Sequence, residues 1–149
     1  MNRFILLDSA PLGMVTNPNA SKQNLACANW LKNLLAQGDF VFIPEIADYE
    51  IRRELLRANK IQGLKRLDLL KTNLDYLPIT TEIMLKAAEF WATVRKQGKP
   101  TAPDFALDGD VILASQAFSL ENVSDVVIIA TSNVKHLSLF VNAQEWEKV

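Results

Sequence analysis

A chain of 149 residues, 49% hydrophobic and 22% charged, has the composition of one soluble globular domain that buries a full core without crosslinks. Its net charge of −1 excludes an overall basic field, so any nucleic acid must be held by local basic patches. The single cysteine, Cys27, excludes an intramolecular disulfide and fits a reducing compartment. The first apolar run, Phe4–Leu7, is too short for a signal peptide or a membrane span, so we expect a cytoplasmic protein with no membrane partner.

Short apolar runs alternate with segments of helical periodicity along the chain. The runs predicted to be buried strands are Phe4–Leu7, Phe40–Ile43, Leu74–Leu77 and Val126–Ala130. Helices are predicted over Lys22–Ala36, from Pro44 to about Asn59, over Leu64–Lys71 after an interruption at Gly63, and over Glu82–Lys96. A loop from Gly98 to Gly109 is then expected to precede a helix that is apolar on nearly all sides. This alternation predicts a single α/β domain over 1–149, with a mostly parallel central sheet flanked by helices.

Polar side chains follow the predicted strands, at the edge where parallel sheets bind ligands. The candidates are Asp8 after the first strand, Glu50 in the helix after the second, Asp108 and Asp110 at the buried helix, and Asn133 after the last strand. Clustered, partly buried carboxylates repel one another by roughly several kcal/mol unless a cation lies between them. Oxygen ligands with no matching Cys or His set favour Mg²⁺ or Mn²⁺ over zinc. The alternative for the two aspartates of the buried helix is ordinary N-terminal capping.

Four segments of the sequence resemble the motifs of PIN-domain ribonucleases, and among these the VapC-like toxins of type II toxin–antitoxin systems. FILLDSAPLG, Phe4–Gly13, is similar to the opening strand that ends in Asp followed by Ser or Thr. IPEIADYEIRREL, Ile43–Leu55, resembles the strand and helix that carry a metal-binding Glu. DGDVILASQA, Asp108–Ala117, is similar to the Asp-x-x-Ile-x-Ala-x-Ala helix, and IIATSNVKHL, Ile128–Leu137, resembles the last strand with its Thr-x-Asp or Thr-x-Asn ending. The motifs follow in the expected order over nearly the whole chain.

The resemblance implies a PIN-like three-layer sandwich and an Mg²⁺-dependent, or Mn²⁺-dependent, endoribonuclease that cleaves single-stranded or structured RNA. It also implies a homodimer and a cognate protein antitoxin as partners. Asp8, Glu50 and Asp110 would be the metal ligands, or one of them the base that activates water. Ser9 and Thr131 would hold the acids through hydrogen bonds, with capping of a strand end as the alternative.

The sequence departs from the family pattern at two places. Asn133 stands at the fourth acidic position, so this catalytic candidate is a neutral ligand, or it positions a metal-bound water or the substrate instead. Asp104 and Asp108 both precede Asp110, which aligns best with the third acid. Asp108 is therefore either a further metal ligand or the helix cap, and Asp104 is expected to be solvated.

Other conspicuous residues allow two interpretations. Arg52 and Arg53 begin a basic stretch that could hold RNA phosphates, or form a solvated helix face paired with Glu54 and Asp68. His136, the only histidine, excludes a His pair and is expected to be a loop or capping residue.

Two other function classes stay open. The chain could be a catalytically weak or inactive PIN-fold RNA-binding or assembly module, or a Rossmann-type phosphatase or nucleotide-binding domain. No G-x-G-x-x-G, G-x-x-x-x-G-K or Asp-x-Asp follows the first strand, which argues against the last class. The presence of Asp8, Glu50 and Asp110 together favours an active nuclease over an inactive module.

Overall fold

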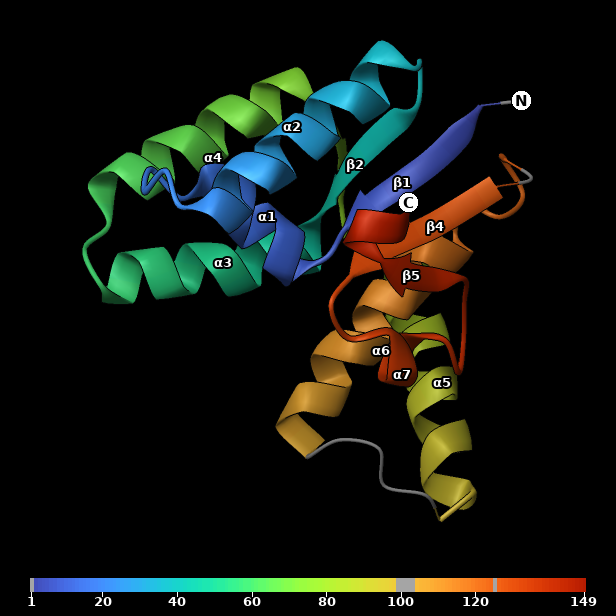
Figure 1. Ribbon diagram of the computed structural model, residues 1–149. Coiled ribbons are helices and arrows are strands. Elements are labelled where there is room, and N and C mark those ends of the chain that lie inside the picture. The colour runs from blue at the N-terminus through green and yellow to red at the C-terminus, as the bar shows by residue number, and fades with distance from the viewer. Residues whose placement is uncertain (1, 99–103, 125) are drawn as a thin grey trace.

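The strands in the described part of the chain, residues 2–98, 104–124 and 126–149 of a computed structural model, form one five-stranded parallel sheet in the order β3-β2-β1-β4-β5 (Figure 1). Their bounds are β1 Arg3–Leu7, β2 Phe40–Pro44, β3 Asp75–Leu77, β4 Val126–Thr131 and β5 Ala143–Glu145. The predicted α/β class and parallel sheet are confirmed. The short β5, with the sequence AQE, was not predicted because it contains no apolar run.

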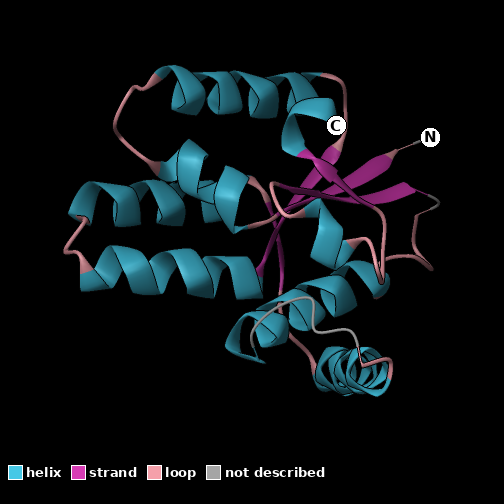
Figure 2. Ribbon diagram, turned by 60° about the horizontal axis from the view of Figure 1, so that its bottom comes forward, coloured by secondary structure: helices cyan, strands magenta, loops and turns pink. Residues whose placement is uncertain are grey.

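Helices cover both faces of the sheet, which gives three layers (Figure 2). Their bounds are α1 Ser9–Thr16, α2 Lys22–Ala36, α3 Glu45–Arg57, α4 Ile61–Asn73, α5 Thr81–Lys96, α6 Asp104–Phe118 and α7 Val134–Leu137, followed by the 3₁₀ helix η1 Trp146–Lys148. The helices α1 to α4 gather on one side, and α5, α6 and α7 on the other (Figure 1). None of the helices in the described residues is long and apolar enough to cross a membrane.

Alternation of side chains along β1 explains why its apolar run is continuous. Ile5 and Leu7 are buried in the core shared with α1 to α4, whereas Leu6 packs with Leu113 and Ala117 of α6 on the opposite face. Successive residues of a strand point to opposite faces, so a strand covered on both sides must be apolar at every position. The sheet is thereby held between two helical layers.

Helix α1 was not predicted, because Pro11 and Gly13 are unfavourable in most helical segments. Pro11 lies in the first turn, where its missing N–H has no intrahelical partner to lose. Asp8 supplies the N-cap, since its side chain accepts a hydrogen bond from the Ser9 backbone N–H. The turn thus begins immediately after β1 and positions Asp8 at the edge of the sheet.

Two predicted helix boundaries are wrong. The break between α3 and α4 occurs around Asn59, which has a positive φ of 53°, and Gly63 lies inside α4. A Cβ at Gly63 would lie 2.8 Å from a methyl of Leu55, so glycine permits the close approach of these two helices. Helix α6 begins at Asp104, a full turn before Asp108, so much of the predicted 98–109 loop is helical. Residues 99–103 of that loop lie outside the described residues.

Candidate active site

Asp8 lies where β1 ends, next to the end of the neighbouring strand β4. Its Oδ1 accepts the Ser9 N–H at 2.7 Å, and its Oδ2 accepts the hydroxyl of Thr131 at 2.6 Å. The parallel pairing of β1 with β4 explains this contact, because their carboxyl ends are in register. Burial raises the pKa of Asp8, although the hydrogen bonds from Thr131 and Ser9 oppose the rise.

Glu50 reaches the same place from α3. The hydroxyl of Ser9 donates to Glu50 Oε1 at 2.7 Å, which joins the first two acids through adjacent residues of α1. Burial raises the pKa of Glu50, Ser9 opposes the rise, and the charge of Asp8 adds to it. The other oxygen, Oε2, lies so close to α6 that a Cβ at Gly109 would be 2.7 Å away. The absence of a side chain at Gly109, which the sequence did not single out, leaves room for this carboxylate.

Asp110 is the third acid, and it comes from α6 on the other side of the sheet. Its side chain is 16% exposed, and its Oδ2 has no hydrogen-bond partner among the described residues. Burial raises the pKa of Asp110 to about 6; the charge of His136 opposes the rise, and the charges of Asp8 and Glu50 add to it. The three predicted acids are therefore electrostatic neighbours, supplied by three separate elements.

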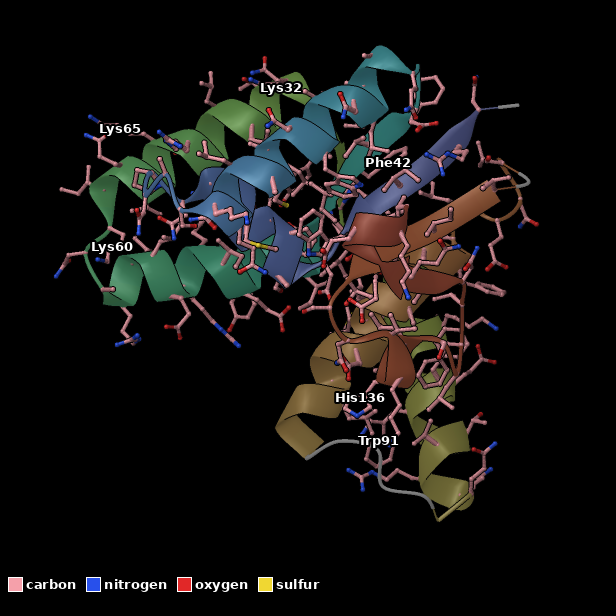
Figure 3. The ribbon with its side chains drawn as sticks, viewed as in Figure 1. Lys32, Phe42, Lys60, Lys65, Trp91 and His136 are labelled. Carbon is pink, nitrogen blue, oxygen red and sulfur yellow. The ribbon has the colours of Figure 1, made fainter. Side chains whose placement is uncertain are left out.

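His136 belongs to this group, contrary to the expectation that it lies in a loop or at a cap. It is part of the short helix α7, and its side chain extends toward α6 (Figure 3). His136 Nδ1 lies 3.4 Å from Asp110 Oδ2 and 3.2 Å from Asn133 Nδ2. Asn133 in turn donates its backbone N–H to Thr131 Oγ1 at 2.8 Å. The only signal in the sequence is the spacing of Asn133 and His136, three residues apart, which places them on one side of a helical turn.

The structure does not place Asp108 with the three acids. Residues two apart in an α-helix point about 200° away from each other around the axis, so Asp108 and Asp110 occupy different faces of α6. Asp108 is exposed and lines a groove of about 390 Å³ with Met84 and Trp91 of α5. It is not the helix cap, because α6 begins a turn earlier. The side chain of Asp104 lies outside the described residues.

The two candidate RNA-binding arginines have different surroundings on α3. Arg52 forms ion pairs with Asp48 at 3.0 Å and Asp68 at 2.9 Å, so its charge is largely offset. The guanidinium of Arg53 lies 5.0 Å from the centre of the exposed Tyr49 ring. Arg53 is also close enough to Glu50 to lower that acid's pKa slightly, against the larger effect of burial. Arg53 is thus the exposed cation beside the acids.

The donor set fits a divalent cation that prefers oxygen ligands, although its side chains are not closed around one. In the described ranges, no three His, Cys, Asp or Glu side chains stand close enough together to enclose a metal ion. The charge of Asp8 nevertheless raises the pKa of Glu50, the charges of Asp8 and Glu50 raise the pKa of Asp110, and Asp110 Oδ2 is buried without a hydrogen bond. A hard cation offsets such repulsion and supplies a partner for an unpaired oxygen. Asp8, Glu50 and Asp110 are the residues that could hold it.

Comparisons with known proteins support this fold. No protein-family model matches the sequence, and no curated protein matches it. A chain of VapBC2 from Rickettsia felis, solved bound to a DNA fragment from their promoter, superposes with a TM-score of 0.72 at 18% identity, covering 95% of this chain and 97% of that one. A chain of FitAcB from Neisseria gonorrhoeae gives 0.68 at 17% identity, covering 97% and 99%. VapC20 from Mycobacterium tuberculosis, named as a sarcin–ricin loop cleaving toxin, gives 0.59 at 13%, covering 92% and 96%. Over nearly its whole length, the chain therefore has the PIN-domain fold of these structures.

Proposed function

We propose that the protein is a divalent-metal-dependent endoribonuclease of the VapC type, acting as the toxin of a toxin–antitoxin pair. The observation that carries this proposal is the meeting of Asp8, Glu50 and Asp110 at the carboxyl edge of the sheet. Each of the three has a raised pKa because it is buried, which is an unfavourable arrangement unless the group serves a function. The cofactor would be Mg²⁺ or Mn²⁺.

The roles of the side chains follow from their contacts. When bound, the cation would stabilise negative charge on a phosphodiester and lower the pKa of an attacking water. Thr131 and the Ser9 N–H orient the two oxygens of Asp8, and the Ser9 hydroxyl orients Glu50. Asn133 supports Thr131 through its backbone N–H, so its position at the site does not depend on a charge. Asp110, the acid with an unpaired oxygen, would be a ligand or the base that takes a proton from water.

The proposed substrate is single-stranded or structured RNA. The fold relative VapC20, named as a sarcin–ricin loop cleaving toxin, supports a cleaving role for this fold. Arg53, exposed beside Glu50, supplies a cation that could hold a phosphate next to the acids. The neighbours in fold include VapBC complexes, which supports a cognate protein antitoxin as a partner. From the resemblance in sequence, we also propose that the protein forms a homodimer and is located in the cytoplasm.

The proposal is tested with isosteric substitutions of the three acids. We expect Asp8→Asn, Glu50→Gln and Asp110→Asn each to reduce metal-dependent RNA cleavage by about 100-fold or more, because each removes a charge that would hold the cation. Cleavage of a labelled RNA with Mg²⁺, with Mn²⁺ and with EDTA measures the effect. Thermal unfolding of each variant checks that the fold remains cooperative.

The matched control is Asp108→Asn, the same substitution on the other face of α6. It is expected to cleave at the parent rate. Parent-level cleavage by Asp8→Asn and Asp110→Asn would refute the assignment of the site. A parent that binds RNA but does not cleave it with either metal would favour the alternative, a catalytically weak or inactive PIN-fold RNA-binding or assembly module.

A further inference from the structure

The unpaired oxygen of Asp110 lies next to a side chain to which the resemblance assigns no role. Asp110 Oδ2 is buried without a hydrogen bond among the described residues, and His136 Nδ1 lies 3.4 Å from it. Both side chains are largely enclosed, with exposed fractions of 16% for Asp110 and 23% for His136. A buried carboxylate oxygen loses its hydration on folding, so a nearby N–H donor has a large effect on where that oxygen stays.

A line of contacts fixes His136 relative to the rest of the site. Asp8 accepts the Thr131 hydroxyl at 2.6 Å, and Thr131 accepts the backbone N–H of Asn133 at 2.8 Å. The side-chain amide of Asn133 then meets His136 Nδ1 at 3.2 Å, and the same nitrogen faces Asp110. The end of β4 and the helix α7 therefore connect Asp8, at the end of β1, to Asp110 of α6.

The chemistry of the neighbours determines which His136 nitrogen carries the proton. An ionised carboxylate can only accept a hydrogen bond, whereas the Asn133 amide offers either an N–H or an oxygen, depending on its orientation. With the proton on Nδ1, His136 can donate to Asp110, and Asn133 can present its oxygen. With the proton on Nε2, the lone pair of Nδ1 would face the lone pairs of the carboxylate. The Nδ1–H form suits both neighbours once the Asn133 amide is turned, so that its oxygen faces His136 in place of the Nδ2 that lies 3.2 Å from Nδ1.

We infer that His136 is a positioning residue, which donates from Nδ1 to Asp110 Oδ2 and thereby directs the Asp110 carboxylate toward the cation site. This inference rests on the proposed function, and it assigns a role to a residue outside the acidic set. Loss of a group that orients a metal ligand typically weakens metal binding by about 10- to 100-fold. Removing the His136 side chain should therefore lower the affinity for the cation while the protein still folds.

Calorimetric titration of the full chain with Mn²⁺ at about pH 8 tests the inference. The side-chain N–H of asparagine overlays Nδ1 of histidine, whereas that of glutamine overlays Nε2. His136→Asn should therefore keep the Mn²⁺ Kd within about threefold of the parent, and His136→Gln and His136→Ala should raise it by about tenfold or more. Lys135→Ala, an exposed neighbour on α7, is the matched control and should leave the Kd unchanged.

The outcomes separate this inference from the proposed function. Equal Mn²⁺ affinity in the parent, His136→Gln and His136→Ala would overturn the positioning role, even if the parent cleaves RNA. An equal loss in His136→Asn and His136→Ala would overturn donation from Nδ1. A parent that binds Mn²⁺ tightly but cleaves no RNA would refute the ribonuclease, while the order of the His136 variants would still decide the inference. A parent that binds no Mn²⁺ would overturn both.

Discussion

Asp110 makes the folded protein sensitive to pH in a direction opposite to that of most carboxyl groups. Its pKa is raised from 3.8 to about 6, first by burial and then by the charges of Asp8 and Glu50, with His136 opposing. The native state consequently binds this proton more tightly than the unfolded chain does. Its contribution to stability is most favourable below about pH 4 and is lost as the pH rises toward 6 and above.

We expect Asp110→Asn, which imitates the protonated acid, to match the metal-free parent in stability at about pH 3.5, below the pKa of Asp110 in the unfolded chain. It should exceed the parent by about 1 to 2 kcal/mol at pH 7, after allowance for solvent screening at a partly exposed group. Urea unfolding at several pH values in EDTA measures the difference. Saturating Mn²⁺ should reverse the order, because only the parent gains stability by binding the ion. If the difference in unfolding free energy between Asp110→Asn and the parent did not change with pH, ionisation of Asp110 would not destabilise the native protein.

The sequence predicted the candidate acids but not their surroundings. Asp8 and Glu50 could be placed because strand ends and the following helix turn have fixed positions in a parallel α/β sheet. His136 and Gly109 could not, because their roles depend on distances across elements: 3.4 Å from α7 to α6, and the close approach of Glu50 to α6. Asp108 was grouped with Asp110 because both were expected at the start of the helix. Both lie inside α6, where residues two apart point to different faces.

At the level of elements, periodicity predicted the long regular segments and missed the short or crowded ones. Helix α2 was predicted with its observed bounds, since its apolar residues keep helical spacing over the whole segment. Helix α1 was missed because a proline and a glycine obscure an eight-residue turn that Asp8 caps. Gly63 was interpreted as a break between two helices, but it lies inside α4 and permits close packing of α4 against Leu55 of α3. Such errors occur where packing between elements overrides the local preference of a residue.

Gly109 provides a test of how α6 accommodates the acid from α3. In an exposed helix, Gly→Ala stabilises by about 1 kcal/mol, but here the new Cβ would lie 2.7 Å from Glu50 Oε2. We expect Gly109→Ala to move the Glu50 carboxylate, to weaken Mn²⁺ binding and RNA cleavage by about tenfold or more, and to change the melting temperature little. Titration calorimetry and thermal unfolding measure the two effects.

Gly63→Ala is the matched control, because its Cβ would meet Leu55 at 2.8 Å, in an apolar contact between α3 and α4. Overpacking there should lower stability by about 1 to 3 kcal/mol and leave the Mn²⁺ Kd unchanged. If Gly109→Ala bound Mn²⁺ like the parent, the space beside Glu50 would have no part in the site.

For the whole molecule, the balance of charge decides how an RNA could approach. The chain has a net charge of −1, and its proposed site is acidic, so no general attraction draws a polyanion to it. Cationic side chains near the acids must therefore attract the RNA phosphates, and ion pairs leave fewer of these side chains available. Arg52 is shared between Asp48 and Asp68, and Arg57 is paired with Glu54 at 2.8 Å. Arg53, which lies over Tyr49 and near Glu50, is the exposed cation of α3 best placed to meet a phosphate.

The phosphate contact predicts a change in the salt dependence of RNA binding. In a cleavage-deficient Asp8→Asn background, the logarithm of RNA affinity should fall linearly with the logarithm of salt concentration, and Arg53→Ala should reduce that slope by about 0.7 to 1. Fluorescence anisotropy with a labelled RNA, measured over a series of salt concentrations, gives the slope. Arg57→Ala, on the same helix but neutralised by Glu54, is the control and should change the slope by less than half as much. Equal slopes for Arg53→Ala and its background would exclude a phosphate contact at Arg53.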